Sequence, residues 1–313
     1  MTRGLVAVTG GTGFLGRRLT VGLMAAGWRV RVLARGPTAG LWGATPPEVT
    51  VGDVRDPAAL AALMGGADAL VHAAGLIKAA NRAAFFDVNR KGAHMAAEAA
   101  FTAGCGRVVQ ISSLAAREPA LSDYAASKRA GEDAARAKLG DRLMVMRPPA
   151  IYGPGDRETL GLFQLARSSP VIPMPRSTTT RLALAHVDDV ARRVTDSLAG
   201  GWVAGTFAFG GARPAGYGWR EIFSAAAAVM GGNPILIPTP DWAIRGSAAL
   251  VEAIGRIRGS PTIFNRGKAS ELLHEDWSVN AHEQHPAAFS PRFELDVGFE
   301  QTVAWYRRKG WLA

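Results

Sequence analysis

Residues 5–16 read Leu5-Val6-Ala7-Val8-Thr9-Gly10-Gly11-Thr12-Gly13-Phe14-Leu15-Gly16, an apolar strand that leads directly into spaced glycines. Gly13 lets the backbone approach phosphate groups, and Gly16 lets the next helix pack closely on the sheet. The unpaired N–H groups at the start of that helix then face the negative charge. With 37 glycines in the chain the spacing alone is weak evidence, but a second apolar strand at residues 29–34 completes a βαβ unit. We therefore expect this loop to bind the pyrophosphate of a dinucleotide.

The chain has 313 residues and a mass of 32.9 kDa, enough for a dinucleotide-binding domain with a smaller companion. Strand-like and helix-like segments alternate up to about residue 150, as a doubly wound parallel sheet requires. We expect strands near residues 4–9, 29–34, 48–51, 69–74, 106–112 and 143–147, and helices near 14–26, 57–64, 83–103 and 123–139. The prediction is an α/β fold: a Rossmann domain at residues 1–150, and at 151–313 mostly a smaller α/β substrate-binding cap. Segments near 183–212 are expected to return to the Rossmann sheet.

The net charge of +10 raises the question of an anionic partner. The arginines are scattered and no basic stripe alternates with aromatic residues, so we expect no nucleic-acid binding. Residues 242–258 fit either a basic amphipathic helix on an anionic bilayer or a helix buried by domain packing. The buried helix is favoured, and peripheral membrane contact stays open. No transmembrane segment or signal peptide is expected and Cys105 is the single cysteine, so the predicted location is cytoplasmic.

The end of the second strand bears on which nicotinamide dinucleotide binds. Enzymes that use NAD place a carboxylate there, on the adenosine ribose hydroxyls, whereas this chain has Ala34-Arg35. An arginine without a nearby acid suits a 2′-phosphate, so we expect NADP(H) to be favoured over NAD(H). Asp53, after the third strand, is expected to accept a hydrogen bond from the adenine amino group. Asp56 is better placed to cap the following helix.

Residues 112–128 hold the groups expected to perform chemistry. Tyr124 and Lys128 are four residues apart on a predicted helix, so both side chains project from one face and the ammonium lowers the pKa of the phenol. Ser112-Ser113 ends the preceding apolar strand, at the edge where wound sheets bind ligands. Strand alternation lets only one of these serines face the site. The pattern predicts a tyrosine acid or base beside a serine that holds a carbonyl or alcohol oxygen.

Together these residues resemble the extended branch of the short-chain dehydrogenase/reductase superfamily, the NAD(P)-dependent epimerase/dehydratase-like proteins, over nearly the whole chain. The matching segments are Thr9–Gly16, Gly52-Asp53-Val54, His72-Ala73-Ala74-Gly75, Asp87-Val88-Asn89 with Gly92, Arg147–Gly155 and His186–Ala191. The resemblance implies that Ser113 polarises the substrate oxygen, that Tyr124 is the general acid/base, and that Lys128 binds the nicotinamide ribose. From the loop, the strand ends and the resemblance, the expected cofactor contacts are Gly10, Thr12, Gly13, Phe14, Leu15, Gly16, Arg35, Asp53, Val54, Ala73, Ala74, Gly75, Asn89, Ser112, Tyr124, Lys128, Pro148 and Ile151. No metal site is expected.

Several functions fit this resemblance. We favour an NAD(P)H-dependent oxidoreductase that transfers a hydride between the nicotinamide and a fairly apolar, small-molecule carbonyl or alcohol substrate, with Tyr124 as general acid/base. Dehydration is disfavoured, because Leu114-Ala115 follows Ser113 where the dehydratases of this branch have an acidic residue. An NAD-dependent sugar-nucleotide epimerase remains an alternative, with Arg181 and Arg213 as candidate diphosphate ligands. A second alternative is a non-catalytic NADPH-binding subunit of a larger complex, although such relatives tend to lose the Tyr–Lys pair. The resemblance also implies a possible homodimer formed through helices 83–103 and 123–139.

Overall fold

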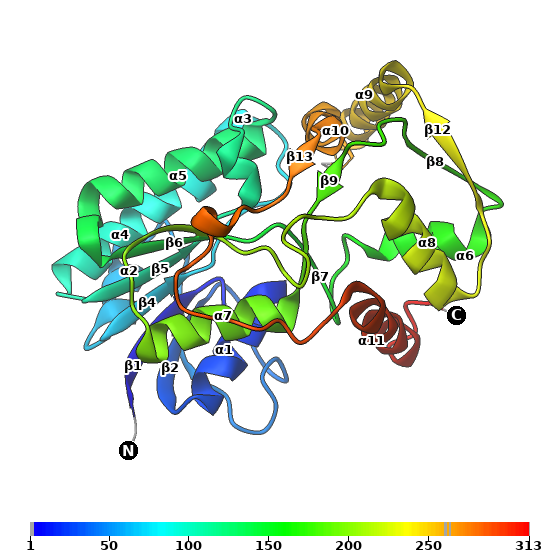
Figure 1. Cartoon of the computed structure of the whole chain (residues 1–313). Coiled ribbons are helices and arrows are strands. Elements are labelled where there is room, and N and C mark those ends of the chain that lie inside the picture. The colour runs from blue at the N-terminus through cyan, green and yellow to red at the C-terminus, as the bar shows by residue number, and fades with distance from the viewer. Residues whose placement is uncertain (1–2, 260–261, 263, 313) are drawn as a thin grey trace. The chain divides into compact units, whose positions relative to one another are not determined.

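The computed structural model describes residues 3–259, 262 and 264–312, and the chain divides into two compact units (Figure 1). The first unit comprises Met1–Arg147, Ala191–Ala208 and His285–Ala287. The second comprises Pro148–Val190, Phe209–Gln284 and Ala288–Ala313. The first stretch of the first unit therefore ends at Arg147, three residues before the sequence-based boundary at 150.

A parallel sheet forms the centre of the first unit. Within the described residues it has seven strands in the order β11-β6-β5-β4-β1-β2-β3. Their bounds are β1 Arg3–Thr9, β2 Trp28–Ala34, β3 Glu48–Val51, β4 Ala69–His72, β5 Arg107–Ile111, β6 Leu143–Arg147 and β11 Gly205–Ala208. The order runs outward from β1 in both directions, so the sheet is doubly wound, which confirms the predicted fold class. The carboxyl ends of β1 and β4 lie next to each other where the direction of winding changes.

Helices cover both faces of this sheet (Figure 1). They are α1 Phe14–Ala25, α2 Pro57–Met64, α3 Arg82–Phe86, α4 Gly92–Thr102, α5 Asp123–Leu139 and most of α7 Val187–Gly200. One continuous core joins α2, α4 and α5 to the sheet, and it includes Leu63, Ala97, Val108, Ala135 and Leu143, each less than 4% exposed. The other face carries α1 and α7 (Figure 1). This apolar packing fixes the strand ends from which the site residues project.

The helix predicted for residues 83–103 differs from the observed one. The structure divides it into α3, a π-helical turn at Asp87–Lys91, and α4. A π turn holds one residue more than an α turn, and such turns are often found at functional sites. Asn89 lies inside this turn and is only 3% exposed, so the irregularity directs a polar side chain into the protein.

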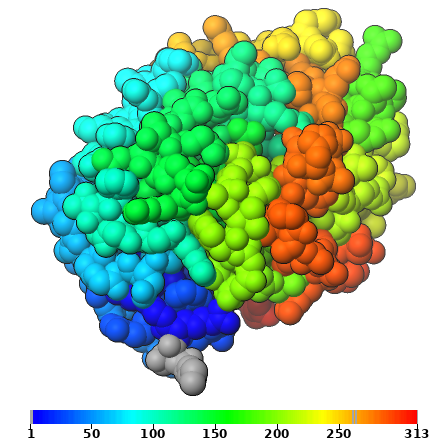
Figure 2. Space-filling view, turned by 60° about the vertical axis from the view of Figure 1, so that its left-hand side comes forward, coloured from blue at the N-terminus to red at the C-terminus, as the bar shows by residue number. Residues whose placement is uncertain are grey.

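Two later segments of the chain also belong to the first unit. β11 pairs with β6 at one edge of the sheet. Residues 285–287 lie against the segment near β11, where the rings of His285 and Phe207 have centroids 4.8 Å apart. Figure 2 shows the part of the chain near residue 200 at the surface, in yellow-green.

The second unit is built from short strand pairs and helices around an aromatic core. Its parallel pairs are β7 Ala150–Tyr152 with β10 Leu184–His186, β8 Val171–Pro175 with β12 Ile235–Thr239, and β9 Arg181–Leu182 with β13 Asp276–Trp277. Its helices are α6 Leu160–Ser168, α8 Trp219–Met230, α9 Asp241–Ile257, α10 Arg266–Leu273 and α11 Leu295–Arg308. The Phe299 ring meets Tyr152 and Phe163 edge-on, with centroids 5.1 and 5.0 Å away. Among the described helices of both units, none combines the length and hydropathy that crossing a membrane requires.

Gly16→Ala is expected to lower the free energy of unfolding by about 1–3 kcal/mol, because its methyl group would overlap the carbonyl oxygen of Gly10. Urea unfolding followed by circular dichroism measures the change. Gly106→Ala is the matched control: a Cβ built there meets no described atom within 4 Å, so its effect should stay within about 0.5 kcal/mol. Equal effects of the two substitutions would contradict this close packing.

Candidate active site

The loop between β1 and α1 has the geometry that a dinucleotide requires. Gly10 has a φ of 71°, and a Cβ built on it would lie 2.5 Å from the backbone of Ala73, so only glycine fits there. Gly13 is the N-cap of α1, and no side chain among the described residues caps this helix. By contrast, Asp56 caps α2, as the sequence predicts, and Ser122 caps α5. The first-turn N–H groups of α1 are thus available to an anion, and the residues present fit a pyrophosphate.

The adjacent strand ends are held together by a buried polar pair. Thr9 Oγ1 and His72 Nδ1 are 2.8 Å apart, and both side chains are at most 4% exposed. Burial, with a smaller effect from the charge of Lys128, lowers the pKa of His72 to about 3. His72 is therefore neutral at physiological pH and acts as a structural hydrogen-bonding group. The pair positions the segment Ala73-Ala74-Gly75, which follows directly on β4.

Asn89 connects this segment to α5. Its side-chain amide accepts a hydrogen bond from the backbone N–H of Leu76 at 2.7 Å and donates to the Leu76 carbonyl at 3.0 Å. It also donates to Ser127 Oγ at 2.9 Å, and Ser127 in turn donates to the carbonyl of Tyr124 at 2.8 Å. α5 approaches closely because Gly131 faces the backbone carbonyl of Asn89, where a Cβ would clash. The π turn thus holds the loop after β4 against the first turn of α5.

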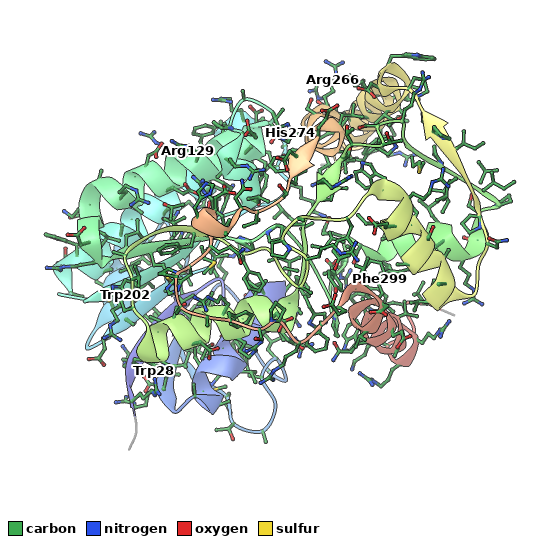
Figure 3. The ribbon with its side chains drawn as sticks, in the orientation of Figure 1. Trp28, Arg129, Trp202, Arg266, His274 and Phe299 are labelled. Carbon is green, nitrogen blue, oxygen red and sulfur yellow. The ribbon has the colours of Figure 1, made fainter. Side chains whose placement is uncertain are left out.

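α5 presents Tyr124 and Lys128 on the same face, one helical turn apart. Lys128 is 8% exposed, and its ammonium donates to the carbonyl of Ile111 at 2.8 Å. Burial lowers the pKa of Lys128 to about 8, an effect that the negative charge of Glu132 opposes. Tyr124 is half-buried, and its ring lies 6.1 Å from that of Phe85. Arg129, next in the sequence, lies on the solvent face of the helix (Figure 3) and pairs with Asp133.

The two serines at the end of β5 have different environments. Ser112 is 5% exposed, and its hydroxyl donates to Glu132 on α5. Ser113 is half-buried, and its Oγ accepts a hydrogen bond from the backbone N–H of Ala115 at 3.2 Å. The hydroxyl of Ser112 is thus used inside the protein, whereas Ser113 lies at the start of the loop that follows the strand.

Glu132 and Arg147 form a buried ion pair that the sequence did not reveal. Glu132 is 2% exposed, and Arg147 donates to its two carboxylate oxygens at 2.8 and 2.5 Å. Glu132 follows Lys128 by four residues, so its place on the Tyr–Lys face was available from the helix period. No local sequence signal identified Arg147 as its partner.

The two residues predicted to bind the adenosine half of the dinucleotide, Arg35 and Asp53, have neighbours that the sequence analysis did not predict. The side chain of Arg35 is 78% exposed, and its guanidinium lies 4.0 Å from the carboxylate of Asp53, so the expectation that no acid lies near it is wrong. Asp53 is bonded mainly to Arg55 at 2.7 Å, which lowers the pKa of this carboxyl. Arg55, which the sequence analysis did not single out, also pairs with Asp87 at 2.7 Å. Neighbouring strands β2 and β3 bring these charges together.

The other predicted cofactor contacts lie in both units. Thr12, Phe14 and Leu15 belong to the glycine loop and the first turn of α1. Val54 is 7% exposed, and its side chain is 3.0 Å from a Cβ built on Gly92. Pro148 and Ile151 belong to the second unit, where Ile151 in β7 pairs with Ala185 in β10. The contacts of all these residues with a cofactor stay predictions.

Arg147→Met is expected to lower the free energy of unfolding by about 3–5 kcal/mol, because the carboxylate of Glu132 would stay buried without its guanidinium partner. Arg29→Met removes one guanidinium from the exposed pair with Glu48, and it should cost less than about 1 kcal/mol. Denaturant titrations of both variants measure the difference. Similar losses in the two variants would show that the Glu132 pair is not a buried charge pair in solution.

Comparison with known proteins gives consistent results. The model of the NAD dependent epimerase/dehydratase family matches residues 6–199. A protein of Caulobacter vibrioides (strain NA1000 / CB15N) named ceramide reductase is 50% identical over 311 residues, 99% of this chain and 96% of that protein. Among solved structures, gox2253 matches with a TM-score of 0.79 at 21% identity, over 99% of this chain and 100% of that one. The Bordetella bronchiseptica enzyme WbmH in complex with NAD⁺ matches with a TM-score of 0.74 at 18% identity, over 98% and 99%.

These similarities confirm the resemblance to extended short-chain dehydrogenases and the predicted Rossmann fold. They also show that this chain is an NAD(P)-dependent oxidoreductase. The family model matches more than half of the residues of this chain. The Caulobacter relative, which is 50% identical, aligns with nearly all of them. This chain therefore belongs to the NAD dependent epimerase/dehydratase family.

Proposed function

We propose that this oxidoreductase uses NADPH to reduce a ketone on a long-chain amide lipid of the ceramide class to the corresponding alcohol. The relative named ceramide reductase, which is 50% identical to this chain, supports a substrate of the ceramide class. The chemistry rests on one observation, the buried Lys128 one helical turn from Tyr124. A ketone is the group on such a lipid that fits, because an amide carbonyl is a much poorer hydride acceptor.

The proposed mechanism assigns one role to each polar group. When bound, a reduced nicotinamide would supply a hydride for the carbonyl carbon. Tyr124 donates its phenolic proton to the carbonyl oxygen, while the Ser113 hydroxyl holds that oxygen by a hydrogen bond. The ammonium of Lys128 stabilises the tyrosinate that remains, and this interaction is strong because the ammonium is shielded from water. Glu132 helps to keep Lys128 protonated, since its charge raises the pKa that burial lowers.

The environment of two arginines supports reduction over sugar-nucleotide epimerisation. Arg213 pairs with Glu221 at 2.7 Å, and its guanidinium lies 4.2 Å from the ring centroid of Tyr217. Arg181 donates to the backbone carbonyls of residues 178–180. A nucleotide diphosphate would have to compete with these partners for one terminal nitrogen of each guanidinium. A purely structural role fits less well, because it gives no reason to bury a lysine beside Tyr124.

The preference for NADPH is part of the proposal. Arg35 follows β2 and is largely exposed, so its guanidinium can turn towards a 2′-phosphate. Asp53 does not compete strongly for it, because this carboxylate is bonded at short distance to Arg55 and lies 4.0 Å from Arg35. A ribose 2′-hydroxyl lacks the charge that would draw Arg35 away from solvent.

Tyr124→Phe is expected to reduce kcat by about 100-fold or more, because it removes the proton donor, while the dissociation constant for NADPH changes little. NADPH absorbance measures the turnover of a ceramide analogue that carries a ketone, and mass spectrometry identifies the alcohol. Tyr306→Phe deletes the same atom from a tyrosine in the core of the second unit and should keep turnover near wild type. Unchanged turnover in Tyr124→Phe would overturn the assignment of the acid.

Arg35→Ser is expected to weaken NADPH binding by about tenfold, the effect of losing one charged hydrogen bond, while NADH binding changes by less than about twofold. Fluorescence titration with each dinucleotide measures both constants. Arg29→Ser removes an exposed arginine from within β2 and serves as the control for net charge. Equal weakening of NADPH and NADH would remove the basis for the cofactor preference.

A further inference from the structure

α9 exposes large apolar side chains, contrary to the favoured prediction of a buried helix. Trp242 is 76% exposed, Leu250 63%, Ile254 40% and Ile257 86%. Residues at these intervals fall along one face of an α-helix. The prediction that residues 242–258 are buried by packing is therefore wrong, and the amphipathic alternative describes the structure better.

The opposite face of α9 is buried against the protein. Ala248 is fully buried and Gly255 is buried, and α9 packs against α10. The helix thus already has a protein-facing side, and the exposed apolar residues are additional to it. Transferring apolar side chains of this size out of water is favourable, so this face can contribute binding energy that the fold does not use.

The strand that precedes α9 also exposes large apolar side chains. In β12, Ile235 is 66% exposed and Ile237 is 46% exposed. Their alternation places both on one face of the strand, and Pro240 joins β12 directly to α9. Figure 1 shows β12 running into α9. We call the six exposed side chains the α9–β12 surface: Ile235, Ile237, Trp242, Leu250, Ile254 and Ile257.

The charge around this surface is positive. Residues 241–273, which include α9 and α10, hold five basic side chains and three acidic ones, a net charge of +2. The basic residues are Arg245, Arg256, Arg258, Arg266 and Lys268, and the acidic residues are Asp241, Glu252 and Glu271, which is bonded to Lys268. Arg245, Arg256 and Arg258 are exposed on or directly after α9, and Arg266 begins α10 (Figure 3). Glu252 is bonded to Arg256, so these two charges largely cancel, and Arg245, Arg258 and Arg266 supply the remaining positive charge.

We propose that the α9–β12 surface binds the interface of an anionic lipid bilayer. Tryptophan and aliphatic side chains beside arginines are the pattern of a helix that lies in the plane of a membrane surface. The chain as a whole carries +10, which adds a long-range attraction to anionic headgroups. A second copy of this chain is a poorer occupant, because it would bring the same positive charge to the contact. The proposal does not require that the substrate be a lipid.

Sedimentation of the full-length protein with vesicles tests the proposal. Vesicles of phosphatidylcholine with phosphatidylglycerol should bind the protein, pure phosphatidylcholine should bind it less, and added salt should weaken binding. The triple variant Trp242→Ser, Leu250→Ser, Ile257→Ser should lose at least about tenfold in binding. The control variant Val21→Ser, Phe101→Ser, Val297→Ser changes three exposed apolar residues elsewhere and should bind like the wild type.

The charge contribution has its own variant. Arg245→Gln, Arg256→Gln, Arg258→Gln should bind anionic vesicles weakly and lose most of the dependence on phosphatidylglycerol. Circular dichroism and ketone reduction in detergent check that each variant is folded, and they report on the proposed reductase activity separately from membrane binding. The proposal would be overturned if the wild-type protein did not bind anionic vesicles. It would also be overturned if the triple serine variant bound them as strongly as the wild type. Conversion of a solution dimer to a monomer by the apolar variant, without vesicle binding, would identify a second copy as the occupant and also overturn it.

Discussion

The ammonium of Lys128 is removed from water, and the proposed mechanism depends on keeping a positive charge in that position. The Ile111 carbonyl accepts a hydrogen bond from it, and Glu132 supplies a compensating negative charge one turn further along α5. Glu132 is in turn neutralised by Arg147 at the end of β6. A charge that is costly to bury is therefore supported by two strand ends and one helix, which requires the sheet to be assembled before the site exists.

The neighbouring ends of β1 and β4 organise another part of the first unit. The buried pair of Thr9 and His72 joins β1 to β4, and Asn89 joins the loop after β4 to α5. The glycines of the first loop leave the N-terminus of α1 open beside these contacts. A cofactor bound along this edge would thus meet backbone groups whose positions are fixed by buried hydrogen bonds, an arrangement that reduces the reorganisation needed for reaction.

The sequence allowed the fold class and the family to be predicted, because glycine spacing and hydrophobic period are local signals. It did not reveal the Glu132–Arg147 pair, since this contact depends on how α5 packs against β6, which is not a local signal. The approach of Arg35 to Asp53 was missed for the same reason, as it depends on the pairing of β2 with β3. For α9, the helical period correctly grouped the apolar residues, but it could not tell which side of the helix packs on the protein.

The π-helical turn at Asp87–Lys91 separates two tasks that one regular helix would have to share. Its additional residue shifts the phase between α3 and α4, so the two helices present their faces independently. α4 buries alanines such as Ala96 and Ala97, whose small size sets how near the neighbouring elements lie. α3 meanwhile offers Phe85 to the ring of Tyr124. The aromatic neighbour of the tyrosine and the alanines that set the helix spacing thus lie on separate helices, on either side of the π-helical turn.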